Sequence, residues 1–175
     1  MIIGMYGSWQ AIDGDPVYRL AYDYGRALAL AGHRILTGGY SGVMEAASRG
    51  AVESGGEATG VTCPEIDAML PKNKWVTHEV KANNLRDRLA RCLDVEVTVF
   101  FPGRKGTISE LSFALELRQK NIFRYPVFLT SNYWDKVIQA CAAIDSELPY
   151  NRSEHASQSL FLHCCSPEEL LEHLK

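Results

Sequence analysis

The sequence predicts an α/β protein built on a doubly wound parallel sheet with helices on both faces. Short apolar runs of strand length alternate along the chain with longer segments in which apolar residues recur at helical spacing. Such alternation is typical of parallel strands that are joined by crossover helices. Residues 95–101 are almost continuously apolar, as expected of a strand that is buried on both faces of a sheet.

Seven short apolar runs are expected to form the strands. In chain order they are residues 2–6, 34–37, 58–62, 75–80, 95–101, 125–130 and 160–164. No internal repeat or linker interrupts the pattern, so residues 1–175 are expected to form a single domain.

Helices are expected between these strands, and two of them carry clear start signals. Asp15 and Pro16 fit the N-cap and first position of a helix that ends at Gly32. Ser166 opens a capping box at the start of the last helix. The remaining helices, recognised by apolar spacing, are expected at residues 42–54, 85–93, 107–120 and 133–144. Residues 63–74 and 146–159 are expected to be loops.

The composition excludes several classes of protein. Hydrophobic residues make up 46% and charged residues 22% of the 175 residues, close to the globular average, which excludes wholesale disorder. The 18 Lys and Arg residues against 21 Asp and Glu residues give a formal charge of -3, which disfavours a nucleic-acid partner gripped by bulk charge. No apolar run approaches the roughly 18–20 residues that cross a bilayer, so we expect no membrane partner.

The N-terminus and the cysteines lead us to expect a cytoplasmic protein. The first residues, Met-Ile-Ile-Gly-Met-Tyr-Gly, lack the basic region of a signal peptide. The five cysteines are odd in number and form no C-x-x-C pair, which favours reduced thiols over a disulfide framework. Because His163-Cys164-Cys165 lacks the second pair of ligands of a zinc site, we expect no bound metal.

Glycine-rich turns follow three of the expected strands, at residues 4–8, 37–42 and 102–107. In an open α/β sheet, ligands bind outside the carboxyl ends of the strands. Glycine allows close approach of the backbone, and the helix that follows offers free N–H groups to an anion. Any one of these turns can be a tight turn and nothing more, but together they favour a phosphate-bearing, nucleotide-like ligand.

Two familiar phosphate-binding motifs fit the chain badly. A dinucleotide site has G-x-G-x-x-G after the first strand and an acidic residue about 20 positions later. Here the first turn lacks that spacing, and the second strand ends in Thr37-Gly38-Gly39. A Walker P-loop has G-x-x-x-x-G-K-[ST], whereas residues 104–107, RKGT, contain these residue types in another order.

Glu110 has two possible roles. With Thr107 it completes the pattern S/T-x-x-E, so it could close the N-terminus of a helix as part of a capping box. It also follows a strand that ends at the ligand edge of the sheet. There its carboxylate could bind a ribose hydroxyl or assist cleavage of a glycosidic bond.

Arginine and tryptophan side chains provide further candidates. Arg86 and Arg88 flank the apolar face of the helix expected at 85–93, and either could clamp a phosphate or lie on a solvated face. We expect Trp9, Trp75 and Trp134 to lie in the core or at an interface rather than to stack on a base.

At two of the turns the chain resembles the Lonely Guy (LOG) family. Residues 37–45, TGGYSGVME, are similar to its GGGxxGLM segment, and residues 102–110, PGRKGTISE, are similar to its PGGxGTxxE signature. Residues 84–88 lie where the family carries an arginine-bearing helix, and the ending at 166–171 is also similar. The resemblance extends over nearly the whole chain.

This resemblance implies a Rossmann-like fold and a homodimer or higher homo-oligomer. It implies a phosphoribohydrolase, which cleaves the N-glycosidic bond of a nucleoside 5′-monophosphate, such as AMP or a cytokinin riboside monophosphate, and releases base and ribose 5-phosphate. No cofactor or metal is needed, and lysine decarboxylation is not expected. The wider superfamily offers a second interpretation as a non-catalytic nucleotide-binding carrier or sensor, such as a molybdenum cofactor carrier. A relative of DNA-processing proteins is a third.

The resemblance also assigns residues to roles. Glu110 matches the motif glutamate that contacts the ribose, and Arg86 or Arg88 matches the catalytic arginine. The residues that would hold the phosphate or nucleotide are Gly7, Ser8, Gly38, Gly39, Gly42, Met44, Gly103, Arg104, Gly106 and Thr107. Arg104 replaces the second glycine of the signature, so we expect it to alter the pocket, either by supplying a cation or by blocking the usual ligand.

Overall fold

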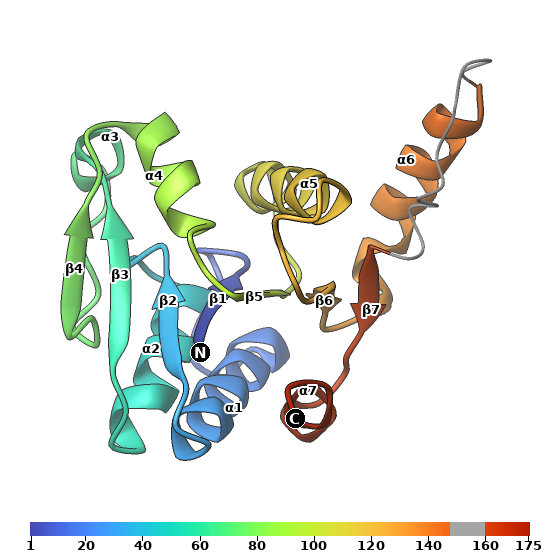
Figure 1. Cartoon of the computed structure of the whole chain (residues 1–175). Coiled ribbons are helices and arrows are strands. Elements are labelled where there is room, and N and C mark those ends of the chain that lie inside the picture. Colours follow the sequence, from blue (N-terminus) through green and yellow to red (C-terminus); the bar gives the residue numbers. More distant parts are fainter. Residues whose placement is uncertain (148–159) are drawn as a thin grey trace.

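The computed structural model describes residues 1–147 and 160–175, and it has the α/β architecture that the sequence predicts (Figure 1). Its strands are β1 (Ile2–Tyr6), β2 (Arg34–Thr37), β3 (Ala58–Thr62), β4 (His78–Lys81), β5 (Val97–Phe100), β6 (Val127–Leu129) and β7 (Phe161–His163). They form one parallel sheet in the order β4-β3-β2-β1-β5-β6-β7. The chain thus winds outward from β1 to β4, returns to β5 beside β1, and winds outward again to β7.

Helices cover both faces of this sheet. They are α1 (Pro16–Leu30), α2 (Val43–Glu53), α3 (Pro64–Asp67), α4 (Leu85–Cys92), α5 (Lys105–Gln119), the 3-10 turn η1 (Asn132–Trp134), α6 (Asp135–Glu147) and α7 (Pro167–His173). Figure 1 shows α1, α2 and α7 below the sheet, and α4 and α5 above it. No helix in the described part of the chain is long and apolar enough to cross a bilayer.

Two apolar cores result, one on each face of the sheet. Ile3 and Met5 of β1 point to the face of α1 and α2, where they join Tyr24 in one buried cluster. Tyr6, one position further along β1, joins Phe100 and residues of α4 and α5 in the other. This alternation is the two-residue period of a strand. Since both faces are filled, the carboxyl ends of the strands remain for a ligand.

Most expected elements agree with the structure to within a few residues, and the differences have local causes. Residues 63–74, expected as a loop, contain the short helix α3. The strand expected at 75–80 begins at His78, because the Trp75 N–H donates to Asn73 Oδ1 (3.0 Å) in a turn and Thr77 Oγ1 accepts from the Ala58 N–H (3.0 Å). Of the loop expected at 146–159, residues 146 and 147 belong to α6, and 148–159 lie outside the described residues.

The helix signals at Pro16, Gly32 and Ser166 behave as the sequence predicts, whereas the Asp15 carboxylate, at the N-cap position of α1, makes no capping hydrogen bond and accepts from the Ile12 N–H (3.0 Å) instead. Pro16 is the first residue of α1, and Gly32 follows its end with a φ of 80°, in the left-handed region that favours glycine. Ser166 caps α7, since its Oγ accepts a hydrogen bond from the Glu169 N–H (3.2 Å).

Helices α1 and α2 pack closely because glycines face the partner helix. A Cβ atom at Gly25 would overlap the carbonyl oxygen of Ala47, and one at Gly50 would overlap that of Tyr22. Neither backbone can move aside without separating the two helices. This contact positions the N-terminal end of α2, which borders the site described below.

We predict that Gly25→Ala lowers the free energy of unfolding by about 1–3 kcal/mol, because the overlap outweighs the gain in helix propensity. Gly106→Ala is the matched control, since a Cβ atom there has no neighbour within 4 Å. That control should be neutral or stabilise by up to about 1 kcal/mol. Urea denaturation measures both changes, and equal effects of the two substitutions would contradict the packing argument.

Candidate functional site

A cavity of about 910 Å³ opens at the carboxyl edge of the sheet, where the chain changes its winding direction. We call it the carboxyl-edge cavity. It lies between the end of β1, the first turn of α2, the segment from α3 to α4, and the start of α5. Its lining residues are Tyr6, Gly7, Trp9, Tyr40, Met44, Ile66, Met69, Leu70, Leu85, Arg88, Arg104, Lys105, Gly106, Thr107, Ile108 and Glu110.

Arg88 is a buried cation in the wall of this cavity. Its Nε donates to the carbonyl oxygen of Val61 (2.9 Å), and one terminal nitrogen donates to that of Gly38 (3.0 Å). The guanidinium carbon also lies 5.3 Å from the centre of the Tyr40 ring, in a cation–π arrangement. These contacts bind α4 to the ends of β2 and β3 and hold the guanidinium in one orientation.

The glycines after β2 are needed for this arrangement. A Cβ atom at Gly38 would overlap the guanidinium of Arg88, and one at Gly42 would overlap the backbone at Ser8 and Trp9. Gly39 and Gly42 have φ values of 83° and 73°, a region that side chains disfavour. Internal packing therefore accounts for these glycines.

Glu110 does not cap a helix, so this part of the expectation is wrong. Helix α5 begins at Lys105 with Arg104 as its N-cap residue, and Thr107 and Glu110 lie inside the helix. The helix therefore starts two residues earlier than the sequence predicts, and Thr107 is its third residue rather than its N-cap. The carboxyl group of Glu110 is consequently free of a capping role and faces the cavity.

Burial raises the pKa of Glu110 to about 7, although the positive charge of Arg88 opposes the shift. An ordinary glutamate is ionised at neutral pH, whereas this one is partly protonated there. A carboxyl with a pKa near the working pH can both accept and donate a proton. Its position beside a fixed arginine in a cavity is typical of functional groups.

Two further cations, Arg104 and Lys105, border the cavity at the start of α5. Both are exposed, and neither has an ion-pair partner among the described residues. Arg104 has a φ of -109°, so the backbone here does not require the glycine that the LOG signature carries. The replacement adds a positive charge to the rim without backbone strain.

The cavity also has large apolar side chains that are open to solvent. Met69 is 73% exposed, Leu85 is 51% exposed and Ile108 is 37% exposed, and all three line the cavity. Exposed large apolar side chains that gather at a cavity mark a ligand or partner site. The cavity thus combines exposed apolar side chains with the two cations at the start of α5.

The structure brings together seven of the residues predicted for the site. Gly7, Met44, Arg88, Arg104, Gly106, Thr107 and Glu110 all line the cavity. The other predicted residues, Ser8, Gly38, Gly39, Gly42, Gly103 and Arg86, do not line it. Arg86 is exposed on α4 and does not line the cavity, which leaves Arg88 as the α4 arginine that does.

Sequence reasoning missed the aromatic residues of the site. Trp9, expected in the core or at an interface, is 48% exposed at the cavity rim. Tyr40 is buried, and its hydroxyl donates to Asp67 Oδ1 (2.9 Å) and accepts from the Cys63 N–H (2.9 Å). Tyr40 lies inside the glycine-rich turn at 37–42 and Trp9 directly follows the turn at 4–8, and that location is the signal that could have identified them.

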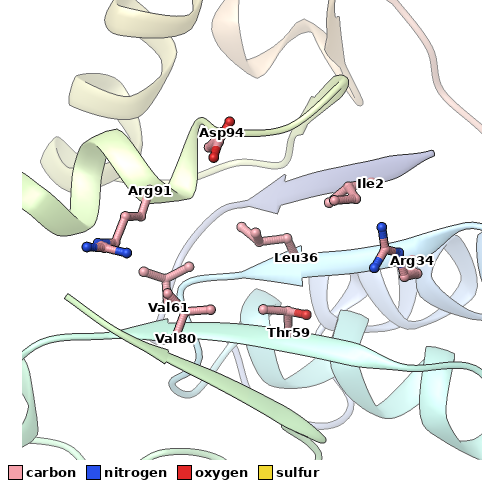
Figure 2. Close-up of a pocket in the computed structure, with 8 residues that line it drawn as sticks. All are labelled: Ile2, Arg34, Leu36, Thr59, Val61, Val80, Arg91 and Asp94. Atoms are coloured by element: carbon pink, nitrogen blue, oxygen red, sulfur yellow. The ribbon is translucent and has the colours of Figure 1, made fainter.

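A second, smaller hollow of about 330 Å³ lies over the sheet below α4, and Figure 2 shows it. Leu36, Val61 and Val80 form its floor, and Arg34 and Arg91 lie toward its two ends (Figure 2). None of the site residues predicted from the sequence lines this hollow. The carboxyl-edge cavity is therefore the candidate site.

The described residues contain no group of three or more His, Cys, Asp or Glu side chains placed to hold a metal ion. The run His163-Cys164-Cys165, from which the sequence predicts no metal site, has other contacts. His163 Nε2 lies 3.2 Å from Asp135 Oδ1, and Cys164 is buried in the core.

Comparison with known proteins gives consistent results. A profile of the SLOG cluster4 family matches residues 1–157. An uncharacterized protein of Archaeoglobus fulgidus is 30% identical over 122 residues, which cover 66% of this chain and 74% of that protein. The structure of a molybdenum cofactor binding protein from Rippkaea orientalis superposes with a TM-score of 0.73 at 26% identity, over 99% of this chain and 94% of that one. The molybdenum cofactor carrier protein of Chlamydomonas reinhardtii superposes with a TM-score of 0.71 at 23% identity, over the same shares.

We predict that Glu110→Gln stabilises the protein increasingly as the pH rises. Because the folded carboxyl has a raised pKa, the unfolded chain releases its proton first, and stability falls between about pH 4.5 and 7. Glutamine removes this penalty, which is at most on the order of 3 kcal/mol above pH 7. Urea denaturation at pH 5 and pH 8 tests the difference. Glu116→Gln, exposed on the same helix, is the control, and an equal pH response of both variants would refute the assignment.

Proposed function

Since the chain belongs to the SLOG cluster4 family of LOG-type α/β proteins, we propose that it binds a small phosphorylated heterocyclic molecule in the carboxyl-edge cavity. The observation that carries this proposal is the combination of cations and exposed apolar side chains in one cavity. Arg104 and Lys105 supply positive charge for a phosphate, and Met69, Leu85 and Ile108 suit a flat ring system. The homodimer and the cytoplasmic location expected from the sequence stay predictions.

The role that we favour is that of a carrier, which binds its ligand without chemical change. Two proteins of similar fold over nearly the whole chain are described as a binding protein and a carrier protein for the molybdenum cofactor. The guanidinium of Arg88 is hydrogen-bonded to two carbonyl groups, so it serves as a fixed electrostatic element of the wall. A carrier needs a preformed pocket with an open mouth. The carboxyl-edge cavity is such a pocket, and exposed apolar side chains border its mouth.

A second role, that of a phosphoribohydrolase, is favoured by Glu110. Cleavage of the bond between ribose C1′ and a base nitrogen builds positive charge on the sugar, which a carboxylate beside the ring stabilises. Water then forms the new bond to C1′, and its proton passes by way of Glu110 to the departing base. The pKa of Glu110 near 7 suits both steps, since the group can hold and release a proton at neutral pH.

We predict that the double substitution of Arg104 and Lys105 by glutamine weakens binding of a phosphorylated ligand at least tenfold. Each lost charge-assisted hydrogen bond to phosphate contributes on the order of 1.5–3 kcal/mol. Calorimetric titration with nucleoside monophosphates and with isolated molybdenum cofactor measures the change. Arg86→Gln removes a nearby charge outside the cavity and should alter affinity less than twofold. Equal effects of the two variants would place the phosphate elsewhere.

We predict that the protein binds nucleoside monophosphates without release of free base, as a carrier does. Chromatography of overnight incubations detects the base. If base appears and Glu110→Gln abolishes its release while binding is retained, the phosphoribohydrolase role replaces the carrier role. If base appears at the same rate with Glu110→Gln, the carrier role is wrong and the hydrolysis does not depend on Glu110.

A further inference from the structure

The carboxyl-edge cavity has a neighbour that shares Trp9 with it, and we propose that the two together accept a dinucleotide, with two nucleoside-like halves joined through a diphosphate. The inference rests on the proposed function, because it takes the phosphorylated part of the ligand to lie beside Arg104 and Lys105. The uncharged nucleoside at the far end of the ligand would occupy the second cavity.

This neighbouring cavity, which we call the Trp9–Trp75 cavity, is distinct from the hollow of Figure 2 and has a volume of about 700 Å³. Its lining residues are Trp9, Gln10, Ala11, Ile12, Asp13, Tyr18, Ser41, Glu45, Arg49, Glu53, Lys74 and Trp75. Both volumes fall in the range of small-molecule sites, roughly 300–1,000 Å³.

Adjacent residues at the start of α2 line different cavities, so the two lie on either side of one turn. Tyr40 and Met44 line the carboxyl-edge cavity, whereas Ser41 and Glu45 line the Trp9–Trp75 cavity. Trp9 lines both. A ligand that passes Trp9 can therefore reach both cavities without entering the protein core.

The backbone around Trp9 is held firmly, although its side chain is 48% exposed. Ser41 Oγ donates to the Trp9 carbonyl oxygen (2.9 Å), and the Ser8 carbonyl oxygen accepts from the Val43 N–H (2.9 Å). An indole ring anchored in this way at a junction presents a flat surface on which a heterocycle can stack. Base stacking on an aromatic side chain contributes about 1–3 kcal/mol per base.

Trp75 provides a second aromatic surface in the Trp9–Trp75 cavity. Lys74 Nζ lies 5.0 Å from the centre of its ring, and the guanidinium carbon of Arg49 lies 5.9 Å from it. Arg49 is itself neutralised, since it donates to Asp13 (2.9 Å) and to Glu53 (3.0 Å). Arg49 thus forms a fixed wall beside the ring, and Lys74 forms no ion pair with the described residues but lies against the same ring.

The charges of this cavity favour an uncharged end of the ligand. Asp13, Glu45 and Glu53 outnumber the two cations, so a second phosphate would be repelled. Glu45 accepts no hydrogen bond from the described residues, and its carboxylate is available to ribose hydroxyls. Carboxylates bind ribose hydroxyls in this way in dinucleotide sites. Because the chain lacks the G-x-G-x-x-G turn, aromatic stacking and the α5 cations would hold the ligand instead.

The test compares mononucleotides with dinucleotides by calorimetric titration of the full chain. We expect NAD or FAD to bind at least tenfold more tightly than any of AMP, GMP, CMP and UMP. Trp75→Ala should remove this gain and change mononucleotide affinity less than twofold. Trp75→Phe should restore most of the gain, which excludes misfolding as the cause. Ile122→Ala, exposed and outside both cavities, should have no effect.

The 2′-phosphate of NADP provides the charge test. We expect it to remove the gain seen with NAD, and Glu45→Gln to recover part of the NADP affinity, because one repelling carboxylate is lost. Equal affinity for mononucleotides and dinucleotides overturns the inference and leaves the proposed function standing. An equal effect of Trp75→Ala on both ligand classes also overturns it. If no phosphorylated probe binds, both the inference and the proposed function fail.

Discussion

The arrangement of the site depends on one buried cation, the guanidinium of Arg88. A buried charge is costly unless hydrogen bonds replace its lost water. Here the carbonyl oxygens of Gly38 and Val61 do so, and the Tyr40 ring covers the guanidinium. Because these groups belong to the segments that follow β2 and to β3, the position of Arg88 determines how α4 meets the sheet. The cavity exists where it does because α4 is held at this position.

This constraint explains features that otherwise suggest direct phosphate binding. Gly38 lacks a side chain because the guanidinium occupies that space, and Gly42 lacks one because the turn that carries Trp9 lies against it. Glycines after parallel strands are common in nucleotide sites, where they permit close approach of the ligand. In this chain two of them permit close approach of other parts of the protein. The ligand would instead be held by side chains on α5 and by the apolar rim.

The chemistry of the cavity follows from the same buried environment. Burial raises the pKa of Glu110, and the positive charge of Arg88 limits this rise. The two effects together determine whether the Glu110 carboxyl is protonated. In the proposed complex, the apolar side chains would cover the ring side of the ligand, and the cations at the start of α5 would attract its anionic side. A carrier and a hydrolase require the same binding surface. They differ in whether Glu110 moves a proton.

The alternation of apolar runs by itself determined the parallel sheet and nearly every element, because burial requires strands and helices of these periods. The glycine-rich turns predicted a site at the carboxyl edge of the sheet, and the family resemblance named Arg88, Arg104 and Glu110 as candidates, all of which line the carboxyl-edge cavity. Only the tertiary structure distinguished Arg88 from Arg86, since the two arginines, two positions apart on α4, point in different directions and only Arg88 meets the carbonyl groups. It alone excluded the cap at Glu110, because α5 begins at Lys105, two residues before Thr107. It also brought Trp9 and Trp75 to one cavity from distant segments, which no local pattern encodes.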